Sequence, residues 1–530
     1  MNRPSAQSNI EPLIRNLKDI VGAEHVITDR KERTFYSTDV FYESNPADLV
    51  IQPGNKDQIA RSIAEAVRTG YTVVARGGGM SYTGGYVPDR EASVIVDMRR
   101  LDRILEINTE DMYVTVECGV TWKRLYEALK EKGVRTPYFG PFSGIHATVG
   151  GALSQNSVFF GSGLHGTAAD AVLGLEVALP DGRIIKTGSA ATPYNPTPFF
   201  RHYGPDLTGI FLGDTGALGF KVQATLRLIK LPPIQLFASF SYEEDAQMAT
   251  AMGEIARQGL ASECYGFDPF LLHLRLKFEG LAQDIKSLAS VVKSGKSLLS
   301  GLKEAAKVAV AGRSFMEGVQ YAMHVTVEGR DQADAESALK KIREIATRQG
   351  KEIENSLPKL VRANPFLPTN RLLGPEGQRW VPVHGIMPHS RVVPFLKALD
   401  DYFNANRELV EKNGIEWGYL CTTVGAGAFL CEPTFFWPDS HYDVHRRHIE
   451  PAHYAKLKQV PTNLDARNAM IKIRKDLAKL FMDFGCIHLQ VGKMYLYRES
   501  RDPLTYALLQ AIKDHVDPHH LVNPGSLGLR

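Results

Sequence analysis

The sequence predicts an α+β protein with two domains, and two features carry that prediction. Residues 49–75 read as a strand, a helix and a second strand, because short β-branched runs flank a segment with helical apolar spacing. Further along, the proline pair at 232–233 interrupts regular structure and suggests a boundary. Beyond this pair, residues 320–349 again show a strand pattern followed by a helix pattern. We therefore expect one domain over residues 1–235 and a second over residues 236–489.

The other elements of the first domain follow from the same patterns. Apolar residues at helical spacing predict a helix over residues 10–21. Aromatic residues then precede the first strand, which lies between two prolines. Further strands are expected at 94–97, 103–108 and 112–117, and a helix at 122–132.

The first glycine-rich segment spans residues 73–88 (VVARGGGMSYTGGYVP) and follows directly on a predicted strand. Glycine accepts backbone conformations that a Cβ forbids, so the run can bend sharply and turn several N–H groups inward. Such a concavity suits a diphosphate, and Ser81 and Thr83 add hydroxyl donors. The run lacks the Gly-Lys-Ser/Thr of a P-loop and leads into a strand rather than a helix. By itself it indicates either an anion site or a plain hairpin.

Two later segments repeat this combination of glycines and strands. Residues 147–188 contain two clusters of glycines, followed by an alternating strand and an Asp-Gly hairpin turn. Residues 210–228 contain three glycines before another alternating strand. Three such segments in this order are not a coincidence, although by themselves they indicate only a potential to bind an anion.

Composition limits the classes of function. The chain has 530 residues, of which 44% are hydrophobic and 23% charged, as in ordinary globular proteins. Its net charge of +3 gives no electrostatic support for nucleic-acid binding. Five cysteines at wide spacing favour neither a disulfide framework nor a zinc site, and we expect no metal. The chain shows no apolar signal core and no long apolar run, so the expected compartment is the cytoplasm.

The residue patterns of the three segments resemble those of a known family. The order RGGGxSxTGG, LGLEVxLPDGRIxKTG and GDTGALGxxxxATLRL resembles the FAD-binding domain of the vanillyl-alcohol oxidase and p-cresol methylhydroxylase superfamily over residues 46–235. The motif DPHHLVNPG at residues 517–525 resembles that family's closing motif. The resemblance implies an FAD-binding domain of two α/β subdomains, completed by about residues 490–530. It also implies a cap, or substrate, domain in which helices flank an antiparallel sheet.

The resemblance assigns the FAD site to the glycine-rich segments and the closing motif. The implied cofactor-binding residues are Arg76, Gly77, Gly78, Gly79, Met80, Ser81, Thr83, Gly84, Pro141, Thr148, Gly150, Gly151, Asn156, Gly161, Gly166, Gly213, Thr215, Gly219 and Asn523.

Attachment of the flavin is expected to be non-covalent. Where family members with bicovalent flavin carry a histidine after the first glycine run, this chain has Met80. The family's second attachment lies in a cap hairpin, and the corresponding residues 423–437 contain neither histidine nor tyrosine. They do contain Cys431, and a cysteinyl link through this residue is the alternative.

The resemblance also suggests catalytic groups near the C-terminus, where Tyr and Arg side chains of the family's phenol oxidases stabilise a phenolate. The candidates here are His488, Tyr495, Tyr497 and Arg498. Tyr497-Arg498 matches the family's residue types, whereas counting back from the closing Asp-Pro points nearer to His488 and Gln490. On a strand, His488 and Gln490 would share one face, and Tyr495 and Tyr497 another.

Other candidates lie outside this stretch. Vanillyl-alcohol oxidase has an aspartate base shortly after the second glycine segment; Thr167 stands at that place here, and Asp170 three residues on is the candidate base. The candidate substrate contacts are Tyr42, Trp417 and Cys431.

The second domain is expected to contain an aromatic-rich hairpin. A helix over residues 394–413 precedes strands at 418–424 and 428–436, and further helices are expected at 466–484 and 502–515. The basic amphipathic segment 281–315 is typical either of a membrane-surface helix or of a helix packed on protein, and we expect no membrane contact.

Three functions remain open from the sequence. The preferred one is FAD-dependent oxidation of a para-substituted, lignin-derived phenol by hydride transfer to flavin N5 through a quinone methide. The second is a D-2-hydroxyacid (lactate or glycolate) dehydrogenase, although the His-rich GHxGDGNxH metal motif of that branch is absent. The third is a flavin-fold protein that binds a ligand without catalysis. The expected partners are a small aromatic substrate, oxygen or a cytochrome-type protein as electron acceptor, and a second copy in a homodimer.

Overall fold

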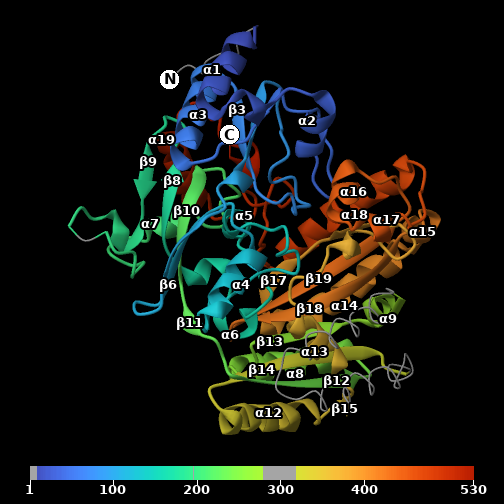
Figure 1. Ribbon diagram of the computed structural model, residues 1–530. Coiled ribbons are helices and arrows are strands. Elements are labelled where there is room, and N and C mark those ends of the chain that lie inside the picture. Colours follow the sequence, from blue (N-terminus) through green and yellow to red (C-terminus); the bar gives the residue numbers. More distant parts are fainter. Residues whose placement is uncertain (1–8, 195, 278–317, 530) are drawn as a thin grey trace.

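The structure is a computed structural model that describes residues 9–194, 196–277 and 318–529. Figure 1 shows two smaller sheets in the upper part of the molecule and one large sheet below them, each covered by helices. This arrangement confirms the predicted α+β class. The amphipathic segment 281–315 lies outside the described residues.

The first sheet has the order β1-β2-β4-β3. Its strands β2, β4 and β3 are parallel, because α3 connects β2 to β3 in the predicted strand–helix–strand unit. Apolar residues of α1 and α3 pack on this sheet in one core. The strands are β1 (Val26–Ile27), β2 (Leu49–Ile51), β3 (Thr72–Arg76) and β4 (Ser93–Asp97).

The second sheet is antiparallel, with the order β5-β6-β10-β8-β9. The second and third glycine-rich segments enter this sheet through β8 and β10. Its strands are β5 (Ile104–Asn108), β6 (Tyr113–Glu117), β8 (Val172–Ala178), β9 (Ile184–Lys186) and β10 (Phe220–Arg227). A short pair, β7 (Val134–Arg135) and β11 (Ile229–Lys230), leads toward the third sheet.

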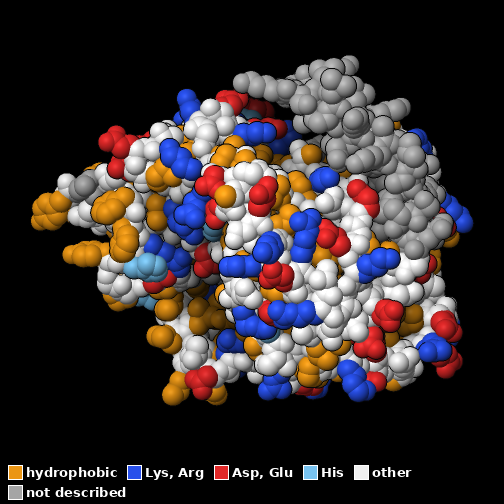
Figure 2. All heavy atoms as spheres, turned by 90° about the horizontal axis from the view of Figure 1, so that it is seen from below, with side chains coloured by type: hydrophobic (Ala, Val, Ile, Leu, Met, Phe, Trp, Pro, Cys, Tyr) orange, Lys and Arg blue, Asp and Glu red, His pale blue; other side chains and the backbone are white. Residues whose placement is uncertain are grey.

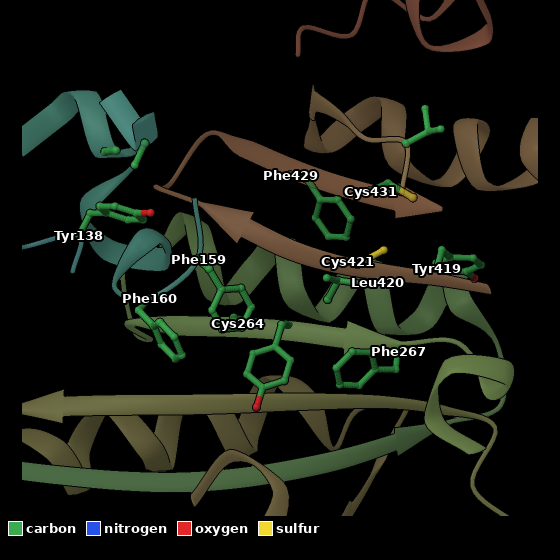
Figure 3. Packing of buried hydrophobic residues seen from close by; sticks show 14 of the residues in the cluster. Tyr138, Phe159, Phe160, Cys264, Phe267, Tyr419, Leu420, Cys421, Phe429 and Cys431 are labelled. Carbon is green, nitrogen blue, oxygen red and sulfur yellow. The ribbon is translucent and has the colours of Figure 1, made fainter. Parts of the chain in front are cut away.

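The third sheet is antiparallel along the order β15-β12-β14-β13-β18-β19-β16, with β17 also paired to β19. Its strands are β12 (Ile234–Tyr242), β13 (Glu263–Phe267), β14 (Tyr321–Gly329), β15 (Lys351–Ile353), β16 (Arg379–Pro382), β17 (Gly385–Pro388), β18 (Glu416–Val424) and β19 (Ala428–Trp437). One hydrophobic core is continuous from the second sheet to this sheet. Figure 3 shows part of it, where Tyr138, Phe159 and Phe160 face the strands that carry Cys264 and Cys421.

Helices cover these sheets and connect them. They are α1 (Glu11–Val21), α2 (Arg30–Tyr36), α3 (Lys56–Arg68), α4 (Trp122–Glu131), α5 (Val149–Gln155), α6 (Ser162–His165), α7 (Leu207–Ile210), α8 (Asp245–Arg257), α9 (Pro269–Lys277), α12 (Gln332–Ala346), α13 (Ser356–Ala363), α14 (His389–Ala405), α15 (Arg407–Lys412), α16 (Asp443–His448), α17 (Pro451–Tyr454), α18 (Leu464–Asp483) and α19 (Pro503–Val516). Among the described residues, none of these helices has the length and apolarity to span a membrane.

The C-terminal part of the chain returns to the first sheet. The N–H of Val73 donates to the carbonyl of Leu521, and the N–H of Asn523 donates to the carbonyl of Val73. The closing motif therefore lies beside β3, at the start of the first glycine-rich segment. The chain thus brings the first glycine-rich segment and the last residues of the protein to one place.

The surface carries both signs of charge. On the described part of the face in Figure 2, Lys and Arg side chains are interspersed with Asp and Glu side chains. This distribution agrees with the small net charge of +3.

Candidate functional site

The three glycine-rich segments line one cavity between the first two sheets. The space beside this lining, open solvent included, is about 910 Å³. The predicted cofactor residues in its wall are Gly77, Gly78, Gly79, Met80, Ser81, Pro141, Thr148, Gly150, Gly151, Thr215 and Gly219. The sequence analysis did not foresee Cys118, Ser143, Ser154, Gln155, Ser157, Lys221 and Gln490, which also line it.

Glycine is required where the first two segments meet. A Cβ on Gly77 would lie 2.4 Å from Thr148 Oγ1, and a Cβ on Gly78 would lie 2.0 Å from the carbonyl oxygen of His146. Gly79 has φ +74°, which favours glycine for conformational reasons. The two backbones can therefore approach closely only without side chains, and this contact forms part of the cavity wall.

The third segment is fixed to the first by the closing motif. Asn523 Nδ2 donates to the carbonyl oxygens of Gly85 (2.8 Å) and Thr215 (2.7 Å). Lys513 Nζ donates to the carbonyls of Ala217 and Val522, each at 2.7 Å. Asn523 thus joins two cavity loops, although its side chain does not line the cavity.

A cation lies in the cavity wall. The side chain of Lys221, on β10, is 2% exposed, and its Nζ lies 2.6 Å from Asp214 Oδ1. Lys221 is the charged residue among those that line the cavity. A cradle of closely packed glycine backbone with an ammonium group beside it fits the diphosphate of a dinucleotide.

Arg76 lies next to this cradle but outside its lining. Its buried guanidinium faces the rings of Phe35 and Tyr36 at 4.9 Å and of Tyr86 at 5.2 Å. Its three side-chain nitrogens make no hydrogen bond within the described part of the chain. The cation is held by ring faces instead, so the structure places Arg76 behind the first glycine segment.

The other predicted cofactor residues shape the loops around the cavity. Gly161 N–H donates to Glu263 Oε1 (2.8 Å), Gly84 N–H donates to Asp39 Oδ2 (2.7 Å), and Gly213 N–H donates to the carbonyl of Leu153 (2.9 Å). The predicted residues outside the cavity lining are Arg76, Thr83, Gly84, Asn156, Gly161, Gly166, Gly213 and Asn523.

A second group of polar side chains begins at Gln490, in the cavity wall. Gln490 Nε2 lies 3.0 Å from Tyr82 Oη. The ring of Tyr82 in turn lies edge-on to Trp380, with centroids 5.8 Å apart, and to His384, with centroids 6.1 Å apart. An aromatic cluster from the first glycine segment and the third sheet therefore adjoins the cavity.

His384 is held in place by Tyr495. Its backbone N–H donates to Tyr495 Oη (2.8 Å), and the same hydroxyl lies 3.3 Å from His384 Nδ1. A hydroxyl that donates to Nδ1 fits the tautomer that carries the ring proton on Nε2. Burial lowers the pKa of His384 to about 3, so the ring is neutral. Nε2 is buried without a protein partner in the described structure.

His488 supports this arrangement. Its Nδ1 donates to the carbonyl of His384 (2.7 Å), and its ring stacks on Tyr495 with centroids 3.8 Å apart. Burial lowers its pKa to about 4. Residues 488–497 form turns rather than a strand, with positive φ at Gln490 and Gly492, so the face argument for a strand does not apply. His488 and Tyr495 are therefore neighbours rather than residues of opposite faces.

Arg474 of α18 was missed by the sequence analysis. It is 1% exposed, and its Nη2 donates to the carbonyl of Tyr82 at 2.6 Å. Its Nε and Nη1 have no partner, and it forms no ion pair with any described residue. The guanidinium lies over the rings of Phe41 (4.0 Å) and Tyr42 (5.1 Å). A buried cation with unused donors is costly unless an anion binds it.

Several predicted site residues lie elsewhere. Arg498 is exposed and faces the ring of Tyr506 at 5.5 Å. Tyr497 faces Arg501 at 5.4 Å. The exposed Asp170 accepts from Thr167 N (2.7 Å) and caps a short 3-10 turn. The structure brings none of the predicted Tyr497, Arg498 and Asp170 to the aromatic cluster.

The three predicted substrate contacts also separate. Tyr42 lies beside Gly84 and Arg474, within the aromatic cluster. Trp417 stacks on Phe403 (centroids 3.7 Å apart) in the core of the third sheet. Cys431 pairs in register with Cys421 on β18 and is fully buried (Figure 3). Burial raises the pKa of the Cys431 thiol well above its usual value, and Cys431 does not line the cavity.

Comparison with known proteins identifies what the cavity binds. Residues 47–188 match the family described as "FAD binding domain", and residues 491–527 match "FAD linked oxidases, C-terminal domain". The chain therefore carries an FAD-binding domain, and the prediction of FAD as cofactor is confirmed. The glycine cradle and the Lys221 ammonium group beside it fit this cofactor.

Two curated relatives match part of the chain. The chain is 30% identical over 257 residues to the uncharacterized FAD-linked oxidoreductase YgcU of Escherichia coli, covering 47% of this chain and 51% of that protein. It is 31% identical over 241 residues to the glycolate oxidase subunit GlcD of Bacillus subtilis, covering 45% and 49%. The chain thus matches only about half the length of these curated relatives.

A solved structure matches nearly the whole chain. A p-cresol methylhydroxylase with substrate bound superimposes with a TM-score of 0.72 at 17% identity, covering 99% of this chain and 98% of that one. At this identity the match shows the fold alone. The chain thus has the fold of this p-cresol methylhydroxylase, and residues 47–188 form its FAD-binding domain.

Proposed function

We propose that this chain is an FAD-dependent oxidoreductase that oxidises a para-substituted phenol, such as a lignin-derived benzylic alcohol. The observation that carries the proposal is Arg474, a buried cation with two unused donor nitrogens inside an aromatic cluster. A phenolate supplies both an anionic oxygen for such a group and a flat apolar ring for the surrounding side chains.

The protein's part in this reaction is to hold the phenol as an anion. Arg474 compensates the charge of the phenolate oxygen, and the neutral His384 offers its Nε2–H as a second donor. Tyr495 and His488 keep His384 in the required tautomer and orientation. Because these donors are fixed and buried, they stabilise charge without reorganising.

The reaction then removes a hydride from the benzylic carbon of the substituent para to the oxygen. FAD, when bound, supplies the acceptor for that hydride. The phenolate gives up two electrons with the hydride and becomes a neutral quinone methide, so that the charge held by Arg474 disappears from the substrate. With a benzylic alcohol, loss of the hydroxyl proton completes conversion to the aldehyde.

A 2-hydroxy acid is the second candidate substrate. Its carboxylate is also an anion that Arg474 could bind, and the relative from Bacillus subtilis is named a glycolate oxidase subunit. The aromatic surroundings, with Tyr82, Trp380 and Tyr42 near the guanidinium, favour the flat phenol. We keep oxygen and a cytochrome-type protein as the two candidate electron acceptors.

The test is to mix the flavin-loaded protein anaerobically with vanillyl alcohol and, in parallel, with D-lactate. Bleaching of the flavin absorbance by the phenol alone supports the proposal. Bleaching by D-lactate alone replaces it with the hydroxy-acid function, and no bleaching by either compound favours a binding protein. Acid precipitation of the same sample should release the flavin, because Cys431 lies in the core rather than in the cavity wall.

A further inference from the structure

Asp39 occupies a place that neither the reaction nor the cofactor explains. It is fully buried, and its carboxylate accepts three backbone N–H groups. Oδ1 accepts from Phe41 (2.8 Å) and Tyr42 (2.5 Å), and Oδ2 accepts from Gly84 (2.7 Å). The first two belong to its own turn, whereas Gly84 belongs to the first glycine-rich segment. One carboxylate therefore joins two segments that are 45 residues apart.

These two segments carry different parts of the site. Tyr42 lies under the guanidinium of Arg474, in the aromatic cluster. Gly84 follows the cavity residues 77–81, and a Cβ on Gly84 would lie 3.6 Å from Tyr42 Cδ2. The position of the Tyr42 ring is therefore set against the glycine segment at the point where Asp39 binds both.

The rest of the turn is held from other directions. The N–H of Val40 donates to the carbonyl of Ser81 (3.1 Å). Arg379 Nη2, on β16, donates to the carbonyls of Val40 (3.1 Å) and Phe41 (2.9 Å). These contacts fix the outer side of the turn. On its inner side the Asp39 carboxylate accepts from Gly84 N–H, and the Tyr86 hydroxyl lies 3.0 Å from the carbonyl oxygen of Thr38 and 3.1 Å from that of Gly79.

We propose that Asp39 is a positioning residue that sets the substrate-binding Tyr42 relative to the FAD-binding glycine segment. This inference rests on the proposed function, because it takes the cluster around Arg474 and Tyr42 as the substrate site. Asp39 touches neither substrate nor FAD in this account. It acts through two backbone segments, so its loss should disturb substrate and cofactor binding together.

The chemistry of the clamp makes it sensitive to substitution and to pH. An ionised carboxylate only accepts hydrogen bonds, so it suits three N–H donors. Protonation of Asp39, or its replacement by Asn, puts an O–H or N–H donor where the backbone N–H groups need an acceptor.

Burial raises the pKa of Asp39 to about 6, against the lowering effect of its three N–H donors and Arg474. The other titratable groups that interact with it are Tyr42 and Tyr86. The clamp should therefore weaken as the pH falls below about 6.

The experiment compares Asp39→Asn with wild type and with the matched control Asp48→Asn. Asp48 also accepts a backbone N–H, that of Ser93 (3.0 Å), but outside the site. For Asp39→Asn we expect a KM for vanillyl alcohol about tenfold or more above wild type, as for loss of a charge-assisted hydrogen bond. We expect a smaller change in kcat, and FAD that dissociates more readily. Asp48→Asn should match wild type in all three.

The pH profile separates positioning from mere structural support. The wild-type KM should rise as the pH falls through about 6. The KM of Asp39→Asn should show no such rise. A lower melting temperature with unchanged KM and FAD affinity would overturn the inference, as would a flat wild-type profile. FAD affinity is read by flavin fluorescence without turnover. If vanillyl alcohol fails to reduce the wild type, the proposed function falls, and an unchanged FAD affinity in Asp39→Asn would then refute the clamp as well.

Discussion

At the scale of single residues, Arg474 carries the proposed chemistry of the substrate site. It lies between Ile473 and Leu477 on the buried face of α18, where the helical pattern calls for apolar residues. A charged residue on that face is a signal present in the sequence, but the family resemblance favours the Tyr497-Arg498 pair instead. Arg474 and Arg498 are the same residue type and differ in their position in the fold, since Arg474 is buried and Arg498 is exposed.

Replacing Arg474 by Met should remove anion binding. The new side chain has a similar volume, but the change also removes the cation near the buried Asp39 carboxylate and the donor to the Tyr82 carbonyl, so the melting temperature is measured beside binding. We expect 4-nitrophenol to bind the wild type as its yellow anion below the pH at which the free probe ionises. Arg474→Met should bind the probe at least about tenfold more weakly, or in its neutral form.

The control for this prediction is Lys475→Met, which removes a positive charge from an exposed position on the same helix. It should leave the binding and the ionisation of the probe unchanged. Binding of the ionised probe by Arg474→Met, with wild-type affinity, would show that another group holds the anion. A large drop in melting temperature would instead indicate that Arg474 serves the core.

At the scale of elements, the sequence predicted the helices and strands whose bounds follow from local residue patterns. The strand expected at 94–97 and the helix expected at 122–132 match β4 and α4 within one residue. The helix expected at 394–413 is divided into α14 and α15 at Asn406, whose φ of −110° and ψ of 20° leave the helical region. Local propensity does not report such a break, because packing on neighbouring elements decides it.

The glycine contact between the first two segments gives a sharp prediction. Gly78→Ala should yield a protein that holds little FAD, because the new Cβ would lie 2.0 Å from the backbone carbonyl of His146 and must push the two segments apart. The measurement is the ratio of flavin to protein absorbance after purification, with the melting temperature beside it. Gly427→Ala, where nothing lies within 4 Å of the new Cβ, should retain full flavin. Full flavin in Gly78→Ala would contradict the role given to this contact.

At the scale of the whole molecule, a cluster of buried charges joins the third sheet to Arg135 of β7. Arg362 of α13 bridges Glu263 (Nη1 to Oε1, 2.5 Å) and Glu328, which also pairs with Arg135 of β7. The guanidinium groups of Arg135 and Arg362 lie 4.7 and 4.6 Å from the ring of Phe139. These side chains are at most 4% exposed. No sequence pattern links residues this far apart, so the cluster was not predictable.

Arg362→Met should therefore destabilise the protein strongly. It leaves two buried glutamates with one arginine, and breaking a buried pair in this way typically costs about 3–5 kcal/mol. The measurement is the free energy of unfolding by urea. Arg348→Met breaks the exposed pair with Glu254, and such pairs contribute only about 0–1 kcal/mol. Equal losses in the two variants would show that the buried cluster stabilises the fold no more than an exposed pair does.

The most direct test of the account is the rate at which vanillyl alcohol bleaches the flavin anaerobically in a single turnover, compared with the same compound deuterated at the benzylic carbon. The account predicts bleaching by both, and a severalfold slower rate with deuterium, because a hydride leaves that carbon. Equal rates, or no bleaching, would contradict the proposed oxidation of a para-substituted phenol.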